Sequence, residues 1–223
     1  MFLEEDKTKK RATHDSKQVA ATYWGHRFEH VCMNSTAPSS DLSLQERFDE
    51  PVNTYREFGI VVKAKLGRHR LIFGAEVDGL DVDGKNYVEL KTNRQLQNDH
   101  HVTNLYKFKF DKFWAQSFLA GVPRILIGFR NYRGILQSLD YLDVASIPKL
   151  TRGRVSWCPE TMLQFGIEFI DWLRDNMKGV ADDKVMRLTF GDHIVSKPSI
   201  KLMVAEPQMP SFILPEFTHS LYY

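Results

Sequence analysis

Three runs of alternating apolar and polar residues between positions 58 and 92 constrain the fold of this chain most. β-Branched and aromatic residues alternate with polar ones over 58–66, 69–79 and 86–92, which is the pattern of half-buried strands. Asp83 and Gly84 lie between the last two runs and predict a two-residue hairpin turn. The sequence therefore predicts an antiparallel hairpin in which the numbers of paired residues sum to 167.

This register gathers charged side chains on one face of the hairpin. Asp78 lies opposite Glu89, and Glu76 lies opposite Lys91. Residues two apart in a strand point to the same side, so three carboxylates and one ammonium meet in one patch. Because opposed Cβ atoms are about 5 Å apart, ionised Asp78 and Glu89 repel each other unless something compensates their charge.

Two interpretations of the acidic patch compete. A hard divalent cation with oxygen ligands would balance the carboxylates, with Lys91 neutralising one charge. Alternatively, the patch is a solvated sheet face where Glu76 and Lys91 form an ordinary ion pair, and spacing alone does not separate the two. The apolar neighbours Phe73, Tyr87 and Val88 favour the metal site, because they predict inner strands, where charges are rarely idle.

The rest of the chain predicts a mixture of helices and strands. Helical spacing covers 16–33, 111–120 and a segment from Pro159 to Gly179, and further strands are expected at 124–130, 134–142 and 184–190. Residues 34–51 predict a loop with one helical turn, and 198–223 a Pro-containing tail that is extended or packed as coil. Without strict βαβ alternation, residues 1–223 predict a single α+β domain of mixed, twisted β-sheets with flanking helices. An acidic residue followed, after a gap, by Glu-x-Lys on an adjacent strand, as in Asp78 and Glu89-Leu90-Lys91, resembles the D-(D/E)XK nuclease core.

Composition narrows the class of protein. The 43% hydrophobic and 26% charged residues exclude a disordered chain, and a net charge of +2 excludes a strongly cationic nucleic-acid binder. Two cysteines, Cys32 and Cys158, are too few for a disulfide scaffold and favour a reducing compartment. No apolar run is long enough to span a membrane, so we expect no membrane partner and an intracellular protein. KTKKR at 7–11 is a weak nuclear signal.

Four motifs resemble the decapping exoribonuclease (DXO) family, which includes the nuclear partner of a 5′-to-3′ exoribonuclease. They are WGHRFE at 24–29, GAEVDG at 74–79, YVELKT at 87–92 and FWAQSFLAGVPRILIGFR at 113–130. The resemblance implies a metal-dependent hydrolase of RNA 5′ ends that removes triphosphate, incomplete guanosine caps or NAD caps, with 5′-to-3′ exoribonuclease activity. It also implies RNA as partner, a 5′-to-3′ exoribonuclease as a second partner, and the nucleus rather than the cytoplasm.

The resemblance also assigns roles to individual residues. Lys91 and Glu89 are the catalytic residues, and Lys91 positions the water that attacks phosphorus. The substrate contacts are Glu29, Lys91 and Gln116. The ligands of two divalent ions, Mg²⁺ or Mn²⁺, are four carboxylates and one backbone carbonyl: Glu29, Glu76, Asp78, Glu89 and Leu90.

Several of these residues have a simpler interpretation when taken alone. Glu29 is then a surface glutamate, and Gln116 a polar residue on a half-buried helix flank. His100 and His101 are expected in a loop, because no second His or Cys pair lies at zinc-ligand spacing. A set of basic residues is suited either to an RNA backbone or to solvent: Lys107, Lys109, Lys112, Arg124, Arg130 and Arg133.

The sequence departs from the family pattern at its start. The family has an arginine motif well upstream of GHRFE, whereas about two dozen residues precede Gly25 and that motif is absent. We therefore expect a shortened or N-terminally incomplete domain. Two other functions compete with the RNA hydrolase: a non-catalytic partner that stabilises a larger 5′-to-3′ exoribonuclease, and a DNA nuclease with the same core.

Overall fold

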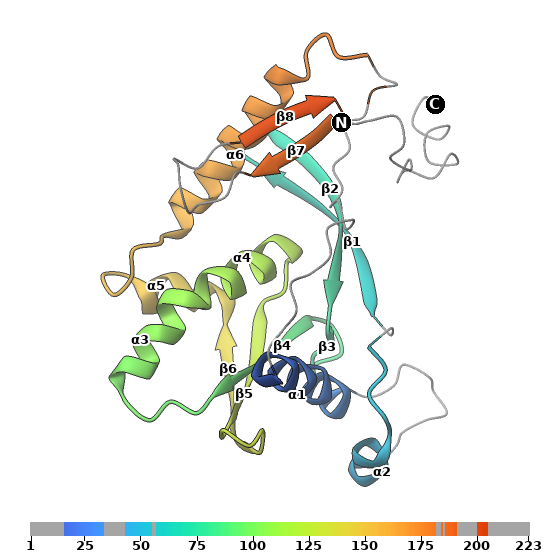
Figure 1. Ribbon diagram of the computed structural model, residues 1–223, viewed down its shortest axis with the longest axis vertical. Helices are drawn as coiled ribbons and strands as arrows, with labels where there is room; N and C mark the ends of the chain where they lie inside the picture. The colour runs from blue at the N-terminus through green and yellow to red at the C-terminus, as the bar shows by residue number, and fades with distance from the viewer. Residues whose placement is uncertain are drawn as a thin grey trace. The chain divides into compact units, whose positions relative to one another are not determined.

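The computed structural model describes residues 16–33, 43–54, 57–181, 184, 186–190 and 200–204 (Figure 1). These fall into two units, one within 13–168 and one that includes 169–223, and each is described by itself. The segment at 7–11 lies outside the described residues. Among the described helices, none is long and apolar enough to cross a membrane.

A mixed four-stranded sheet forms the centre of the larger unit. β4 and β5 are parallel, whereas β3 and β6 pair with them antiparallel at the two edges. The parallel crossover from β4 to β5 contains α3 (Asp99–Phe108) and α4 (Phe110–Ala120). Mixed sheets with helices confirm the α+β fold class. In spatial order the strands are Gly79–Leu80 (β3), Tyr87–Arg94 (β4), Arg124–Arg130 (β5) and Leu136–Asp143 (β6).

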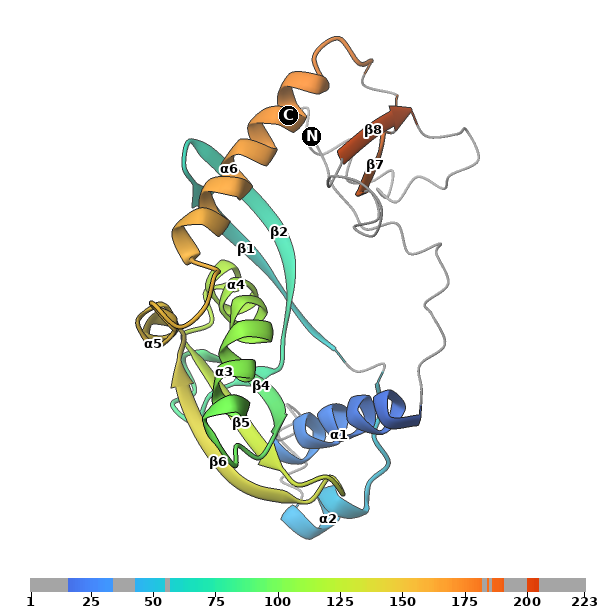
Figure 2. The ribbon, with the colours of Figure 1, turned by 60° about the vertical axis from the view of Figure 1, so that its left-hand side comes forward.

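Helices cover both faces of β4 and β5. On one face, Trp114 of α4 packs with Ile125 and Ile127 of β5 in an apolar cluster that α3 also joins. On the other face, Phe28 of α1 (Ser16–Cys32) packs against Leu90, and both views show α1 beside β4 (Figures 1 and 2). Burying apolar side chains on both sides makes these two strands the core of the unit.

Two glycines leave room for the aromatic residues of α1. A Cβ at Gly128 would lie 2.7 Å from the ring of Phe28, and one at Gly134 would lie 2.4 Å from the ring of Trp24. Gly134 also has φ +84°, which L side chains rarely adopt. The guanidinium of Arg130 lies 4.3 Å from the centre of the Trp24 ring. The β5–β6 turn therefore fixes where α1 lies.

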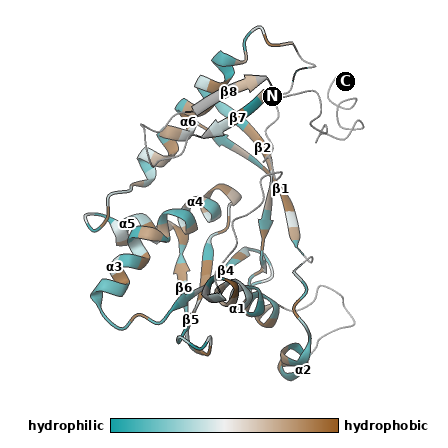
Figure 3. Cartoon of the chain, in the orientation of Figure 1, coloured by the Kyte–Doolittle hydropathy of each residue, from teal (hydrophilic) through white to brown (hydrophobic). Residues whose placement is uncertain are grey.

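A separate two-stranded ribbon precedes the central sheet. β1 (Phe58–Leu66) and β2 (His69–Val77) pair antiparallel along their whole length. One side of the ribbon is half-buried; at its end Val77 packs with Ala120 and Val122. Hydropathy changes from residue to residue along both strands (Figure 3), as expected for a ribbon with one covered face.

The C-terminal part of the chain differs in part from the prediction. In the smaller unit, α6 (Pro159–Asn176) ends, and β7 (Met186–Phe190) pairs antiparallel with β8 (Ile200–Val204). The tail predicted from residue 198 as extended or packed as coil contains a strand at 200–204, which pairs with β7. Residues 205–223 lie outside the described part of the chain.

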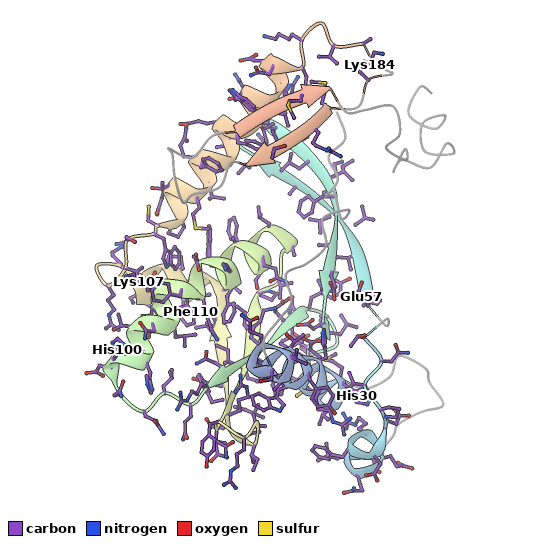
Figure 4. All side chains as sticks on the ribbon, viewed as in Figure 1. His30, Glu57, His100, Lys107, Phe110 and Lys184 are labelled. Carbon is purple, nitrogen blue, oxygen red and sulfur yellow. The ribbon has the colours of Figure 1, made fainter. Side chains whose placement is uncertain are left out.

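Short helices occur in the connecting segments, and only one of them was expected from the sequence. α2 (Leu44–Asp49) is the expected helical turn, stabilised by a capping box between Ser43 and Glu46. A 3-10 turn and α5 (Ile147–Thr151) follow β6. The loop expected around His100 and His101 is wrong, since the side chain of Asn98 accepts a hydrogen bond from the backbone N–H of His101 and begins α3. His100 projects outward from α3 (Figure 4).

The hairpin has the expected register but a different turn. Gly79 pairs with Val88 and Leu80 with Tyr87, so the predicted sum of 167 is confirmed. The two-residue turn is wrong: residues 82–85 form a four-residue loop. The Asp83 carboxylate causes this, because it accepts hydrogen bonds from the backbone N–H groups of Lys85 and Asn86 and from the Asn86 side chain.

These three hydrogen bonds predict a pH-dependent contribution of Asp83 to stability. They lower the pKa of Asp83 from 3.8 to about 2. A carboxylate with a depressed folded-state pKa stabilises the fold above its ordinary pKa and loses that effect as pH falls through the folded value. Asp83→Ala should therefore lower the melting temperature at pH 7, and its deficit should shrink between about pH 4 and pH 2. Asp140→Ala, an exposed substitution on β6, is the control; an equal, pH-independent deficit in both variants would contradict the assignment.

Candidate active site

The buried carboxylate of Glu89 is the centre of the candidate site. Its side chain is only 2% exposed, and it lies on β4 between the edge strand β3 and β5. Lys91, two residues further along the strand, donates a hydrogen bond to Glu89 Oε1. Gln116 of α4 donates to the same oxygen through Nε2 at 2.8 Å. The prediction that Glu89 and Lys91 share a face is confirmed, and Gln116 adds a contact from the helix above.

Two further contacts continue the interaction between β4 and α4. Lys91 Nζ lies 6.0 Å from the centre of the Phe113 ring, and Lys109 Nζ donates to Asn93 Oδ1 at 2.7 Å. The strand supplies every second residue and the helix supplies residues three or four apart, so the two elements meet along one line. Sequence reasoning missed Asn93 and considered Lys109 for an RNA backbone or for solvent. The period of two after Glu89 was the available signal for Asn93.

Asp78 lies where the chain passes from one sheet to the other. It belongs to neither β2 nor β3, and its Oδ2 accepts a hydrogen bond from the backbone N–H of Leu90 at 2.5 Å. Asp78 therefore lies beside β4, as the predicted register requires, but it does not form a regular strand pair with Glu89. The ligand role expected for the Leu90 carbonyl stays a prediction.

Glu76 is placed differently from the sequence prediction. It is exposed on β2 and pairs with Gly59 of β1, so the expected pairing with Lys91 is wrong. The reason is that the chain changes sheets at Asp78, which ends the predicted long strand at Val77. Burial and then Glu57 raise the pKa of Glu76 most. Asp78 also raises this pKa and Lys91 lowers it, so Glu76 remains within electrostatic reach of the site.

Glu29 enters the site from the last turns of α1. Its side chain is 37% exposed, and His26, one turn earlier, places Nδ1 3.4 Å from Glu29 Oε2. Burial and then Asp78 raise the pKa of Glu29, while His26 and Lys91 lower it. Glu29 is therefore part of the acidic cluster rather than a solitary surface glutamate. Sequence reasoning missed His26, although the spacing of three in GHRFE could have indicated it.

The four carboxylates carry more negative charge than their surroundings balance. Burial is the largest cause that raises the pKa of each, and Asp78 raises the pKa of the other three. Lys91 lowers the pKa of all four. One ammonium therefore serves a cluster of four acids: Glu29, Glu76, Asp78 and Glu89.

Hard oxygen donors that repel one another have the chemistry of a Mg²⁺ or Mn²⁺ site. Their present arrangement is not a finished one, because within the described residues no three His, Cys, Asp or Glu side chains are grouped to hold a metal ion. Glu89 Oε1 already accepts from Lys91 and Gln116, and Asp78 Oδ2 from Leu90. By donor chemistry the residues fit a divalent cation.

Besides Lys109, two more of the basic residues considered for RNA binding have contacts inside the protein. Arg124 forms an ion pair with the buried Asp81 and lies 5.2 Å from the centre of the Tyr141 ring. Arg130 lies against Trp24. These contacts attach the hairpin loop and α1 to β5, so both residues support the site's frame.

Comparison with known proteins adds an independent observation. Residues 1–218 match the family model described as RAI1 like PD-(D/E)XK nuclease. A curated relative, the decapping nuclease RAI1 of Aspergillus fumigatus, is 37% identical over 174 residues, covering 73% of this chain and 47% of the relative. The chain thus spans about half the length of the curated relatives it matches.

Solved structures show the same fold. Rai1 of Scheffersomyces stipitis has a TM-score of 0.76 at 25% identity, covering 92% of this chain and 57% of that one; its complex with (3′-NADP)⁺ and calcium has a TM-score of 0.67 at 26% identity, covering 84% and 50%. Rai1 of Candida albicans in complex with pU5 and Mn²⁺ has a TM-score of 0.74 at 26% identity, covering 91% and 57%.

The crowded acids predict that removing one charge stabilises the metal-free protein. A carboxyl whose folded-state pKa is raised favours folding at low pH and loses that effect as pH rises through the raised value. Glu89→Gln imitates the protonated form and keeps an oxygen for Lys91, so it should raise the melting temperature at pH 8. The expected gain is about 2–4 °C for each kcal/mol of relieved repulsion. It should shrink toward pH 5, where the native carboxyl is itself increasingly protonated. Thermal unfolding with a chelator present measures it; a loss of stability at pH 8 would show that Glu89 must be ionised for folding.

Proposed function

Because the chain belongs to the RAI1-like PD-(D/E)XK nuclease family, we propose that it carries the active site of a metal-dependent hydrolase of RNA 5′ ends. The observation that carries the proposal is the buried Glu89 carboxylate, held by Lys91 and Gln116 beside Asp78 and Glu29. Buried, crowded carboxylates with a single lysine are costly for stability, and such costs are typical of catalytic sites.

Two divalent ions, Mg²⁺ or Mn²⁺, are part of the proposal. Four acids and the Leu90 carbonyl are the proposed ligands, and Mn²⁺ in the Candida albicans relative supports the choice of metal. When bound, the ions supply charge stabilisation for the phosphoryl oxygens and acidify water. The acids bring the negative charge that attracts them: Glu29, Glu76, Asp78 and Glu89.

Lys91 and Gln116 have donors to spare for the substrate. The Lys91 ammonium has three N–H donors and gives one to Glu89, so two remain for a water and a phosphate oxygen. Gln116 is exposed and uses one amide hydrogen on Glu89, which leaves the second for a phosphate oxygen. Both groups are held by Glu89, so the water and the phosphate are positioned by the same carboxylate.

The proposed reaction is attack of water on the phosphorus that remains on the RNA as its 5′-monophosphate. In a triphosphate end this is the α-phosphorus, and pyrophosphate leaves. In a capped or NAD-capped RNA it is the phosphodiester phosphorus after the first nucleotide, and a cap dinucleotide or NAD leaves. The decapping name of the Aspergillus relative, the pU5 of the Candida complex and the (3′-NADP)⁺ of the Scheffersomyces complex support these substrate classes. Exoribonuclease activity, association with a 5′-to-3′ exoribonuclease and work in the nucleus belong to the same proposal and rest on the family resemblance.

The proposal is tested by incubating the chain with 5′-triphosphorylated, unmethylated-capped and NAD-capped RNA at millimolar Mg²⁺ or Mn²⁺. Metal-dependent release of pyrophosphate, cap dinucleotide or NAD is the expected result. Cleavage of the matched DNA at an equal rate would instead support a DNA nuclease. A chain that hydrolyses none of these substrates but stabilises a 5′-to-3′ exoribonuclease would support the non-catalytic alternative.

Substitutions separate metal binding from water positioning. Lys91→Ala should reduce turnover by about 10²–10⁴-fold, the usual range for a proton-transfer or water-positioning group, with metal affinity retained. Asp78→Ala should weaken metal binding as well as turnover. Calorimetric titration of Mn²⁺ beside the turnover assay gives both numbers.

The two catalytic residues should also behave as one unit. Groups that act on one transition state are strongly non-additive, so a Lys91→Ala/Glu89→Gln double variant should turn over about as slowly as the slower single variant. Asp140→Ala on β6 is the control and should match the native chain. Fully multiplicative losses would mean that Lys91 and Glu89 act independently.

A further inference from the structure

On the solvent-facing side of the β1–β2 ribbon, all charged residues other than Glu76 are positive. Alternation along both strands places eight exposed residues on this side. Apart from Glu76 at the site, they are cationic, apolar or glycine. From the site outward they are Glu76 and Gly59, Gly74 and Val61, Ile72 and Lys63, and Arg70 and Lys65, each pair directly opposed across the ribbon.

The cations of this side are not arranged for the stability of the ribbon itself. Lys65 lies directly opposite Arg70, and like charges in opposed positions destabilise a strand pair. Lys63, one step nearer the site, lies opposite the apolar Ile72. Among the described residues, no acid forms an ion pair with Lys63, Lys65 or Arg70. An anion bound over them would remove the repulsion.

The ribbon side is also open and partly apolar. A Cβ added at Gly59 or Gly74 would meet nothing within 4 Å, so the surface next to Glu76 is unobstructed. Val61 is 79% and Ile72 74% exposed, although both are large apolar side chains. Apolar groups beside cations suit a ligand with an anionic backbone and flat, partly apolar bases.

The length and direction of the strip match a strand that leaves the acidic site. Glu76 and Arg70 are six residues apart on β2, which at about 3.3 Å per residue corresponds to about 20 Å. One end of this line lies at the carboxylates proposed to act on the 5′ phosphates. A single RNA strand continuing from that point would place its next phosphates over the cations.

We propose that Lys63, Lys65 and Arg70 form a binding strip for the phosphodiester backbone of single-stranded RNA downstream of the 5′ end. Charge complementarity selects this occupant, because Lys63 and then the opposed Lys65 and Arg70 follow one another along the ribbon in the direction away from the acidic cluster, and no acid among the described residues forms an ion pair with them. The inference rests on the proposed function, since it takes the 5′ end to lie at the acidic cluster.

The strip is tested with the triple variant Lys63→Ala/Lys65→Ala/Arg70→Ala, made in the full chain. Fluorescence anisotropy with a 3′-labelled, 5′-phosphorylated ten-nucleotide oligouridylate, without divalent cation, measures binding directly. We expect about tenfold weaker binding at 0.15 M salt. The slope of log K against log salt should fall by about 2, because each lost contact to single-stranded nucleic acid contributes about 0.7.

A matched variant, Lys85→Ala/Lys149→Ala/Arg152→Ala, removes three exposed cations elsewhere and lowers the net charge equally. It should keep the native affinity within about twofold. Equal losses in the two variants would mean that only net charge matters and would overturn the strip. A second result would also overturn the strip. If the strip variant binds RNA as well as the native chain but no longer binds a labelled polyglutamate peptide, these cations bind an acidic protein segment instead.

Hydrolysis distinguishes failure of the strip from failure of the proposed function. With Mg²⁺, a 5′-triphosphorylated dinucleotide is too short to reach the strip, so native chain and strip variant should release pyrophosphate from it equally. On a ten-nucleotide substrate the variant's KM should rise about tenfold with kcat unchanged. If the native chain hydrolyses neither substrate, the proposed function fails. If it hydrolyses both and the strip variant matches it on both, the strip fails alone.

Discussion

The rest of the site depends on one buried charge, the carboxylate of Glu89. A carboxylate that is 2% exposed is tolerated only where donors surround it, and leaving such a group unpaired costs about 3–5 kcal/mol. Lys91 and Gln116 provide those donors from the same strand and from the helix above. Because β4 carries the charge and α4 carries one of its donors, the geometry of the site depends on how α4 packs against β4.

Packing away from the carboxylates keeps this arrangement in place. Trp114 and the isoleucines of β5 hold α4 against the sheet. On the opposite face, the gap at Gly128 admits the ring of Phe28, which determines how far α1 brings Glu29 toward the site. The ion pair of Arg124 with Asp81 attaches the hairpin loop to β5. Apolar contacts thus hold acids that repel one another in place. A bound cation would relieve this repulsion, so the repulsion favours cation binding.

Because the chain changes sheets at Asp78, one part of the site is buried and another part is exposed. On one side of this residue, Glu89 and Lys91 lie in the covered sheet under α4. On the other, Glu76 lies on the exposed side of the ribbon, in line with the cations of β1 and β2. A residue in no strand, held by the N–H of Leu90, therefore joins a buried centre suited to chemistry with an open surface suited to a polymer.

The sequence by itself determined the register of the β3–β4 hairpin and the shared face of Glu89 and Lys91. Alternation and the Asp83-Gly84 pair are local signals, and side chains two apart must share a face, so Glu89 with Lys91 followed from spacing alone. Tertiary structure decided what depends on distant segments. The break at Asp78 removed the predicted pairing of Glu76 with Lys91, since β2 found a better partner in β1. The contact of Gln116 with Glu89, 27 positions away, exists only because the parallel crossover lays α4 over β4, which no local pattern encodes.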